Sequence, residues 1–102
     1  MYYQYPDAKL CPAHLVESLT RYAEHGVPVG GFLTACLENN LLEAIARADG
    51  ENLPLLPHIV AWLYEYMPFG AWRSRENVEA WLATKRAARE RSHGAPITGE
   101  NV

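Results

Sequence analysis

The chain has 102 residues, of which 49% are hydrophobic and 11% aromatic, a composition that indicates one small globular domain and excludes a disordered chain. The net charge of −3 is divided unevenly. Residues 1–72 carry −5 from three basic and eight acidic residues, and residues 73–102 carry +2 from six basic and four acidic residues. An acidic body with a mildly basic C-terminal segment is too weak a signal to assign nucleic-acid binding.

Membrane insertion and secretion are not expected from this sequence. No apolar run reaches 18 residues, the length needed for a membrane span. The first ten residues, MYYQYPDAKL, lack the charged start and apolar centre of a signal peptide. The two cysteines, Cys11 and Cys36, form no CxxC pair and no disulfide framework. These features predict reduced thiols in a cytoplasmic protein.

The N-terminal part predicts an extended arm over residues 1–10 and a first helix over residues 12–25. Pro12 suits the first turn of a helix, where its missing N–H costs nothing. Leu15, Leu19 and Tyr22 recur at the spacing of one helical face. Gly26 stands where a left-handed residue commonly ends a helix.

Two short helices are predicted next, over residues 31–39 and 41–48. The pair Gly30–Gly31 suits a tight turn that starts the first of them, and Asn39–Asn40 suit a cap or corner between the two. In the helix over residues 41–48, we expect the large apolar residues to face the core: Leu41, Leu42 and Ile45.

The most apolar segment, residues 54–67, predicts a central helix whose regular part begins near Leu56, because Pro57 fits only the first turn. Ser74 is a suitable N-cap for a last helix over residues 75–91. After Leu82 this helix keeps only alanines as apolar residues, which predicts a solvated, basic second half.

The predicted fold is therefore all-α, a compact single-domain bundle of about five helices without a sheet. An extended arm (1–10) precedes the helical domain (11–92), and a frayed tail (93–102) follows it.

The sequence gives only weak signals for a phosphate-binding, metal-binding or catalytic site. The glycine pair follows a helix and precedes no lysine, so it lacks the pattern of a phosphate loop. Cys11 and His14 are spaced like two metal ligands, but no second pair completes a site. Cys11 lies at a helix start, which could lower its pKa, but no base accompanies it. Four carboxylates lie in turn-like, polar contexts: Glu38, Glu43, Asp49 and Glu51. We expect no enzyme, no cofactor and no metal; a hydrolase or transferase using Cys11 or these carboxylates is the weakest alternative.

The expected partner-binding residues lie near the two ends of the chain and in the loop before the last helix. Tyrosine, tryptophan and arginine dominate interface hot spots, and exposed anchors of these types suit a partner protein or a second copy of the chain. The expected contact residues are Tyr2, Tyr3, Tyr5, Trp72, Arg73, Arg75, Lys85, Arg86 and Arg89. The alternative is a small nucleic-acid-associated protein using Lys85, Arg86, Arg89 and Arg91, although Glu90 interrupts this basic run.

A family resemblance covers residues 20–83. The segment RYAEHGVPVGGFLTACLENNLLEAIARADGEN, then LYEYMP and WRSRENVEAWLA, resembles a group of small proteins encoded in tailed-phage and prophage genomes. The shared pattern is a Tyr-x-x-x-Gly start, a Pro-x-Gly-x-Phe turn, an Asn-Asp corner, an Arg-Ala-Asp stop and a late Trp helix. The matching positions are Tyr22, Gly26, Pro28, Gly30, Phe32, Asn39, Arg47, Ala48, Asp49 and Trp81.

Two positions depart from that pattern. Asn40 stands where Asp is usual, which weakens a carboxylate role at this corner, and Arg73 stands where Gly often precedes the serine. The resemblance implies a non-enzymatic phage accessory protein in the bacterial cytoplasm. It would bind a host protein complex, and it could inhibit a nucleic-acid-binding defence complex such as CRISPR–Cas by occupying a basic groove.

Overall fold

The computed structural model describes residues 7–94, with side chains to residue 91. Over this range the chain is all-α, as predicted, and contains no strand. The five α-helices are α1 (Ala13–His25), α2 (Gly31–Leu37), α3 (Leu41–Arg47), α4 (Leu56–Tyr66) and α5 (Arg75–Gly94). Three short 3-10 helices are η1 (Ala8–Leu10), η2 (Leu53–Leu55) and η3 (Phe69–Ala71).

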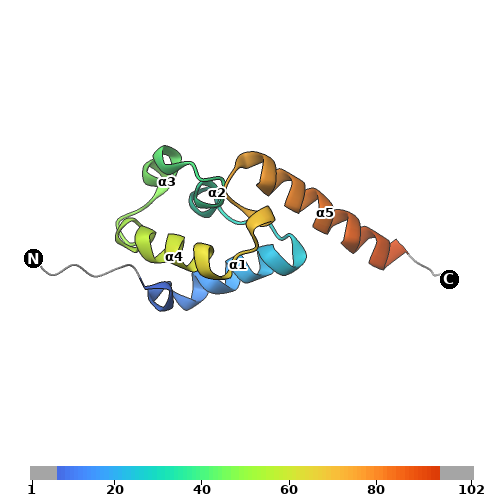
Figure 1. The fold of residues 1–102 in the computed structure, drawn as a ribbon, viewed down its shortest axis with the longest axis horizontal. Coiled ribbons are helices and arrows are strands. Elements are labelled where there is room, and N and C mark those ends of the chain that lie inside the picture. The colour runs from blue at the N-terminus through green and yellow to red at the C-terminus, as the bar shows by residue number, and fades with distance from the viewer. Residues whose placement is uncertain (1–6, 95–102) are drawn as a thin grey trace, which may run out of the picture.

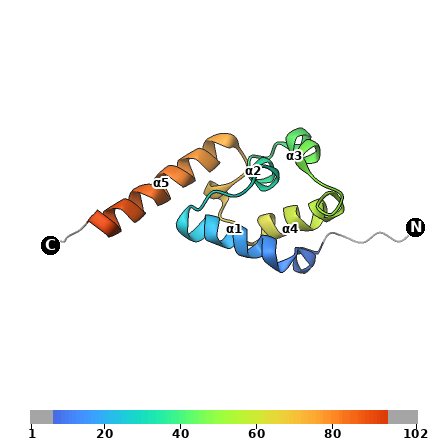
Figure 2. The same cartoon turned by 180° about the vertical axis from the view of Figure 1, so that it is seen from behind.

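The helices α1 and α4 lie side by side and run in the same direction, and α2 and α3 pack against each other at a tight corner (Figures 1 and 2). The helix α5 diverges from the other helices, and its last turns extend beyond them (Figures 1 and 2), although Lys85 and Arg89 in the half predicted to be solvated still contact the end of α1. The largest fully buried side chains come from α1, α2 and α4: Leu19, Tyr22, Leu37, Ile59 and Leu63. Burial of these side chains is the main stabilising contribution to the fold.

Local signals explain the helix boundaries. Gly26 ends α1 with a φ of 68°, in the left-handed region that glycine tolerates best. Gly30 is the N-cap of α2, so the glycine pair starts a helix. Asn39, with a φ of 60°, makes the corner, and the Asn40 side chain accepts the Glu43 N–H at 3.2 Å. The Ser74 hydroxyl accepts the Asn77 N–H at 3.1 Å at the start of α5.

The segment before α1 differs from the expected extended arm. The Asp7 side chain accepts the Lys9 N–H at 2.9 Å, and this local bond favours the 3-10 turn of η1. The Asp7 N–H is also bonded to Nδ1 of His58, and Ala8 is buried. Residues 8–10 therefore pack on α4 as part of the domain, while residues 1–6 lie outside the described residues.

The prediction that the large apolar residues of α3 face the core is wrong. Leu41, Leu42 and Ile45 are exposed, and Ala44 is the one fully buried residue of the helix. The cause is the close approach of α3 to α2. At this corner a small side chain fits between the helices, and Arg47 lies across Gly31, where an added Cβ would come within 2.8 Å of a guanidinium nitrogen.

Candidate protein-binding groove

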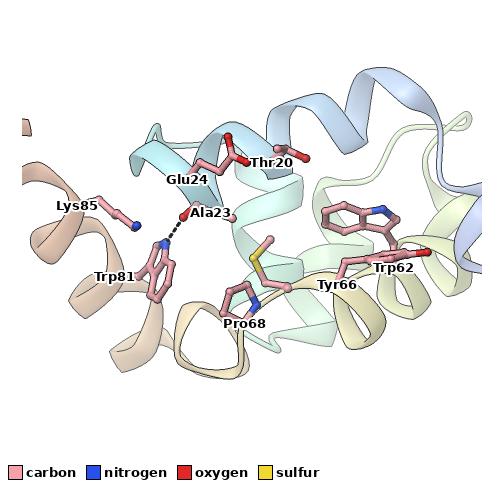
Figure 3. A pocket seen from close by; sticks show the side chains of 9 residues that line it. Thr20, Ala23, Glu24, Trp62, Tyr66, Pro68, Trp81 and Lys85 are labelled. Carbon is pink, nitrogen blue, oxygen red and sulfur yellow. Dashed lines mark hydrogen bonds between the residues drawn. The ribbon is translucent and has the colours of Figure 1, made fainter. Parts of the chain in front are cut away.

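An open groove of about 560 Å³ lies between α1, α4 and α5 (Figure 3). Aromatic side chains from two helices line it: Trp62 and Tyr66 from α4, and Trp81 from α5. Glu24 on α1 and Lys85 on α5 lie at the end of the groove nearest Trp81 (Figure 3), and the lining is completed by Thr20, Ala23, Met67 and Pro68. A mostly apolar hollow with a few polar groups is the usual form of a binding site.

The α4 side of the groove arises from helical spacing. Trp62 and Tyr66 are four residues apart, so they share one face of the helix. Their ring centroids are 5.4 Å apart and their planes meet at 45°. Tyr66 is 55% exposed, and Trp62 is half-buried. The pair therefore presents a ring surface toward solvent, while Trp62 also packs against the core.

The α5 side of the groove is held against the end of α1. The Trp81 indole N–H donates to the carbonyls of Tyr22 and Ala23, at 3.3 and 3.2 Å. The Lys85 ammonium lies 5.0 Å from the centre of the Trp81 ring, a cation–π contact. One turn later Arg89 donates to the carbonyl of His25, the last residue of α1. A cation at the C-terminal end of α1 donates to a carbonyl that the helix leaves without a partner, and it interacts favourably with the negative end of the helix dipole.

These contacts change the expected role of two basic residues. Lys85 and Arg89 are half-buried against α1 and already have contacts within the chain. Arg86 and Arg91 are exposed on the extending part of α5. The four cations predicted to act together are therefore divided between an intramolecular contact and the surface.

The expectation that Trp72 is an exposed anchor is wrong. Its exposed fraction is 7%, and it belongs to the hydrophobic core. The neighbouring backbone explains this: the Arg73 N–H donates to the Leu37 carbonyl at 2.6 Å, and the Asn77 side chain donates to the Trp72 carbonyl at 2.9 Å. These bonds fix the loop against α2 and turn the indole inward.

The other predicted contact residues fall in separate places. Arg73 is exposed over the Phe69 ring, 4.8 Å from its centre, and Arg75 is exposed with its Nε 3.1 Å from a Glu79 carboxylate oxygen. Of the predicted residues that the structure describes, only Lys85 lines the groove. Tyr2, Tyr3 and Tyr5 lie outside the described residues. The sequence predicts a central helix over residues 54–67 but carries no signal that Trp62 and Tyr66 line a groove.

The cysteine environment differs from the one a reactive thiol needs. Both thiols are buried. Burial raises the pKa of Cys11 and raises the pKa of Cys36 to about 11, with the neighbouring Cys11 as the smaller cause for Cys36. The helix start, which could have lowered the Cys11 pKa, is outweighed by burial, because removal from water disfavours the thiolate.

Within the described part of the chain, no three His, Cys, Asp or Glu side chains gather in a metal-holding group. None of the helices described there combines the length and apolarity of a membrane span.

The chain was also compared with known proteins. No family model, curated protein or solved structure matches it.

Proposed function

We propose that this chain is a non-enzymatic protein-binding module, and that the groove between α1, α4 and α5 takes a segment of its partner. The observation that carries the proposal is the partly exposed ring surface of Trp62, Tyr66 and Trp81, gathered from two helices in one open groove. Aromatic residues of this kind supply most of the binding energy at protein interfaces. A buried aromatic core would leave no such surface.

The chemistry of the groove favours an extended segment that carries a proline or an aromatic side chain. Flat rings stack on such side chains without a large entropic cost, as they do in domains that bind proline-rich segments. Glu24 and Lys85 both lie at the end of the groove nearest Trp81 (Figure 3). A charged group on the bound segment would find a complementary partner at this end, which sets the direction of the segment.

The resemblance to tailed-phage proteins supports a host protein complex as the partner class. The acidic body supports a basic surface on that complex, since residues 1–72 carry −5. A nucleic-acid-binding defence complex, including CRISPR–Cas, has such a surface, and occupying it would inhibit the complex. In this proposal the chain acts in the bacterial cytoplasm.

A pair of tyrosines on α4 provides a matched test. Tyr66 lines the groove, whereas Tyr64 is 74% exposed and does not line it. The tagged wild-type chain would capture proteins from a bacterial lysate, and the captured protein would then be purified and titrated by calorimetry. Tyr66→Ala should weaken binding at least about tenfold, and Tyr64→Ala by less than about twofold.

The proposal is wrong if every captured protein binds Tyr66→Ala as well as it binds the wild type. It is also wrong if the purified chain binds DNA or RNA at low salt, with Arg86→Ala weakening that binding and Tyr66→Ala leaving it unchanged. That second result would instead support nucleic-acid association through Arg86 on the exposed part of α5. Low salt is used because contacts with phosphate groups weaken steeply as the salt concentration rises.

A further inference from the structure

The chain enters the folded domain beside the face of α4 that builds the groove. The Asp7 N–H donates to Nδ1 of His58 at 3.1 Å, and η1 packs on α4. His58, Trp62 and Tyr66 follow one another at intervals of four residues, so they form one stripe along the helix. Trp62 and Tyr66 also line the groove, which continues from them toward Trp81 (Figure 3). The residues before Asp7 are therefore joined to the domain at the start of a stripe that leads into the groove.

The six residues before Asp7 have the composition that the groove favours. We call residues 1–6, MYYQYP, the N-terminal segment. Three tyrosines and a proline make up most of it, and stacking on aromatic rings favours both residue types. It contains no charged side chain, so it meets no repulsion from Glu24 or Lys85 in the groove. Pro6 also favours an extended backbone at the residue before it. The composition is thus that of the extended segment proposed above for the groove.

The spacing of the tyrosines matches the spacing of the groove rings. Trp62 and Tyr66 lie about 6 Å apart along the axis of α4, because a helix rises about 1.5 Å per residue. Their ring centroids are 5.4 Å apart. In an extended chain, side chains two residues apart point to the same side and lie about 7 Å apart. Tyr3 and Tyr5 have this separation, so two rings of the N-terminal segment can stack on two rings of the groove at the same time.

The length of the N-terminal segment also matches the position of the groove rings. Along α4, the two residues that carry these rings lie about 6 Å and about 12 Å beyond His58. Counted back from Asp7 in an extended chain, Tyr5 lies at about 7 Å and Tyr3 at about 13 Å. The two sets of distances start from nearly the same point, because Asp7 is bonded to His58. Each tyrosine therefore comes level with one groove ring.

From this match we infer that the N-terminal segment docks in the groove of its own chain, with Tyr5 on Trp62 and Tyr3 on Tyr66. A short tether raises the effective concentration of a segment to the millimolar range, so a weak contact is enough to fill the groove in much of the population. The regulatory consequence rests on the proposed function, because a partner segment must displace the N-terminal segment to enter the same groove.

The first test detects the contacts in the full chain by nuclear Overhauser spectroscopy. We expect contacts between ring protons of Tyr5 and Trp62, and between ring protons of Tyr3 and Tyr66. The absence of both contacts overturns the inference. In an equimolar mixture of isotope-labelled and unlabelled chains, contacts between the two kinds of chain would assign the groove to the N-terminal segment of a second copy. That outcome overturns docking within one chain.

The second test is competition by the free peptide MYYQYP, followed through tryptophan fluorescence of the full chain. Tyr3→Ala combined with Tyr5→Ala should strengthen peptide binding at least about threefold, because the wild-type groove is closed to the peptide whenever its own segment occupies it. Tyr2→Ala is the matched control. It removes a tyrosine from the opposite side of an extended segment and should bind the peptide as the wild type does. Equal affinities for the double variant and the wild type, or no binding to either, overturn the inference.

A third measurement separates this inference from the proposed function. The two tests above need no partner protein, so their failure leaves partner binding through Tyr66 intact, and their success does not depend on a partner. With the captured partner, the double variant should bind at least about threefold more tightly than the wild type. Weaker binding would instead place Tyr3 and Tyr5 in the partner interface and overturn their role as competitors for the groove.

Discussion

Arg73 occupies a backbone conformation that ordinary side chains avoid. Its φ is 92°, and the structure holds it there because its N–H is bonded to the Leu37 carbonyl. Glycine adopts this region without steric cost. Arg73 therefore carries backbone strain that a glycine at this position would not have.

Substitution of Arg73 separates backbone strain from the loss of its side chain. Arg73→Gly and Arg73→Ala both remove the guanidinium that lies over Phe69. Only the glycine variant also relieves the strained φ. We expect the glycine variant to be more stable than the alanine variant by about 1 kcal/mol in urea unfolding. Equal stabilities would show that the loop relaxes without strain at this position.

At the scale of elements, the join between α1 and α5 depends on Gly26. A Cβ added at Gly26 would lie 2.4 Å from the Lys85 Cβ, close to the backbone of α5. The glycine therefore serves two purposes, since its φ of 68° also ends α1. This approach brings Trp81, Lys85 and Arg89 to the last carbonyls of α1 and so builds one side of the groove.

Gly26→Ala should lower the free energy of unfolding by about 2 kcal/mol or more, because it adds left-handed strain to a clash with α5. Gly30→Ala is the control, since a Cβ there meets nothing within 4 Å and the φ of −68° suits alanine. Urea unfolding followed by circular dichroism measures both variants. If the two variants unfold at the same urea concentration, the close contact between α1 and α5 does not stabilise the fold.

At the scale of the whole molecule, the core contains groups that resist losing a proton. Burial raises the pKa of Tyr22 to about 12, and the Glu38 carboxylate is the smaller cause. Burial raises the pKa of Cys36 to about 11. Tyr22 also joins distant parts of the chain, since its hydroxyl donates to the Ala71 carbonyl at 2.6 Å. Its ionisation is therefore coupled to the packing of α1 on η3.

Stability should fall as pH rises from about 9 to about 12. The unfolded chain releases these protons near the ordinary values, 9.0 for cysteine and 10.0 for tyrosine, while the folded chain keeps them. The stabilising contribution is thus complete below those values and is lost as pH rises through the folded pKa of each group. Urea unfolding across this range measures the slope.

Tyr22→Phe is the control for the tyrosine contribution. It should cost about 1 kcal/mol at neutral pH through the lost hydrogen bond, and it should flatten the decline above pH 10. An equally steep decline in this variant would assign the alkaline loss to other groups.

The sequence alone determined the helices and most of their ends, because these depend on neighbouring residues. Gly26, Asn40 and Ser74 cap helices through bonds within a few positions, and the spacing of Leu15, Leu19 and Tyr22 marks the buried face of α1. Such signals act over one or two turns and need no knowledge of the partner helix.

Only the tertiary structure decided which helix faces and which side chains are exposed to solvent. Arg89 contacts His25 across 64 positions, and the packing of α3 on α2 buries Ala44 instead of the larger residues beside it. The burial of Trp72 and the groove position of Tyr66 arise in the same way. The physical reason is that burial depends on which helix covers a residue, and a contact between distant segments leaves no periodic trace in the sequence.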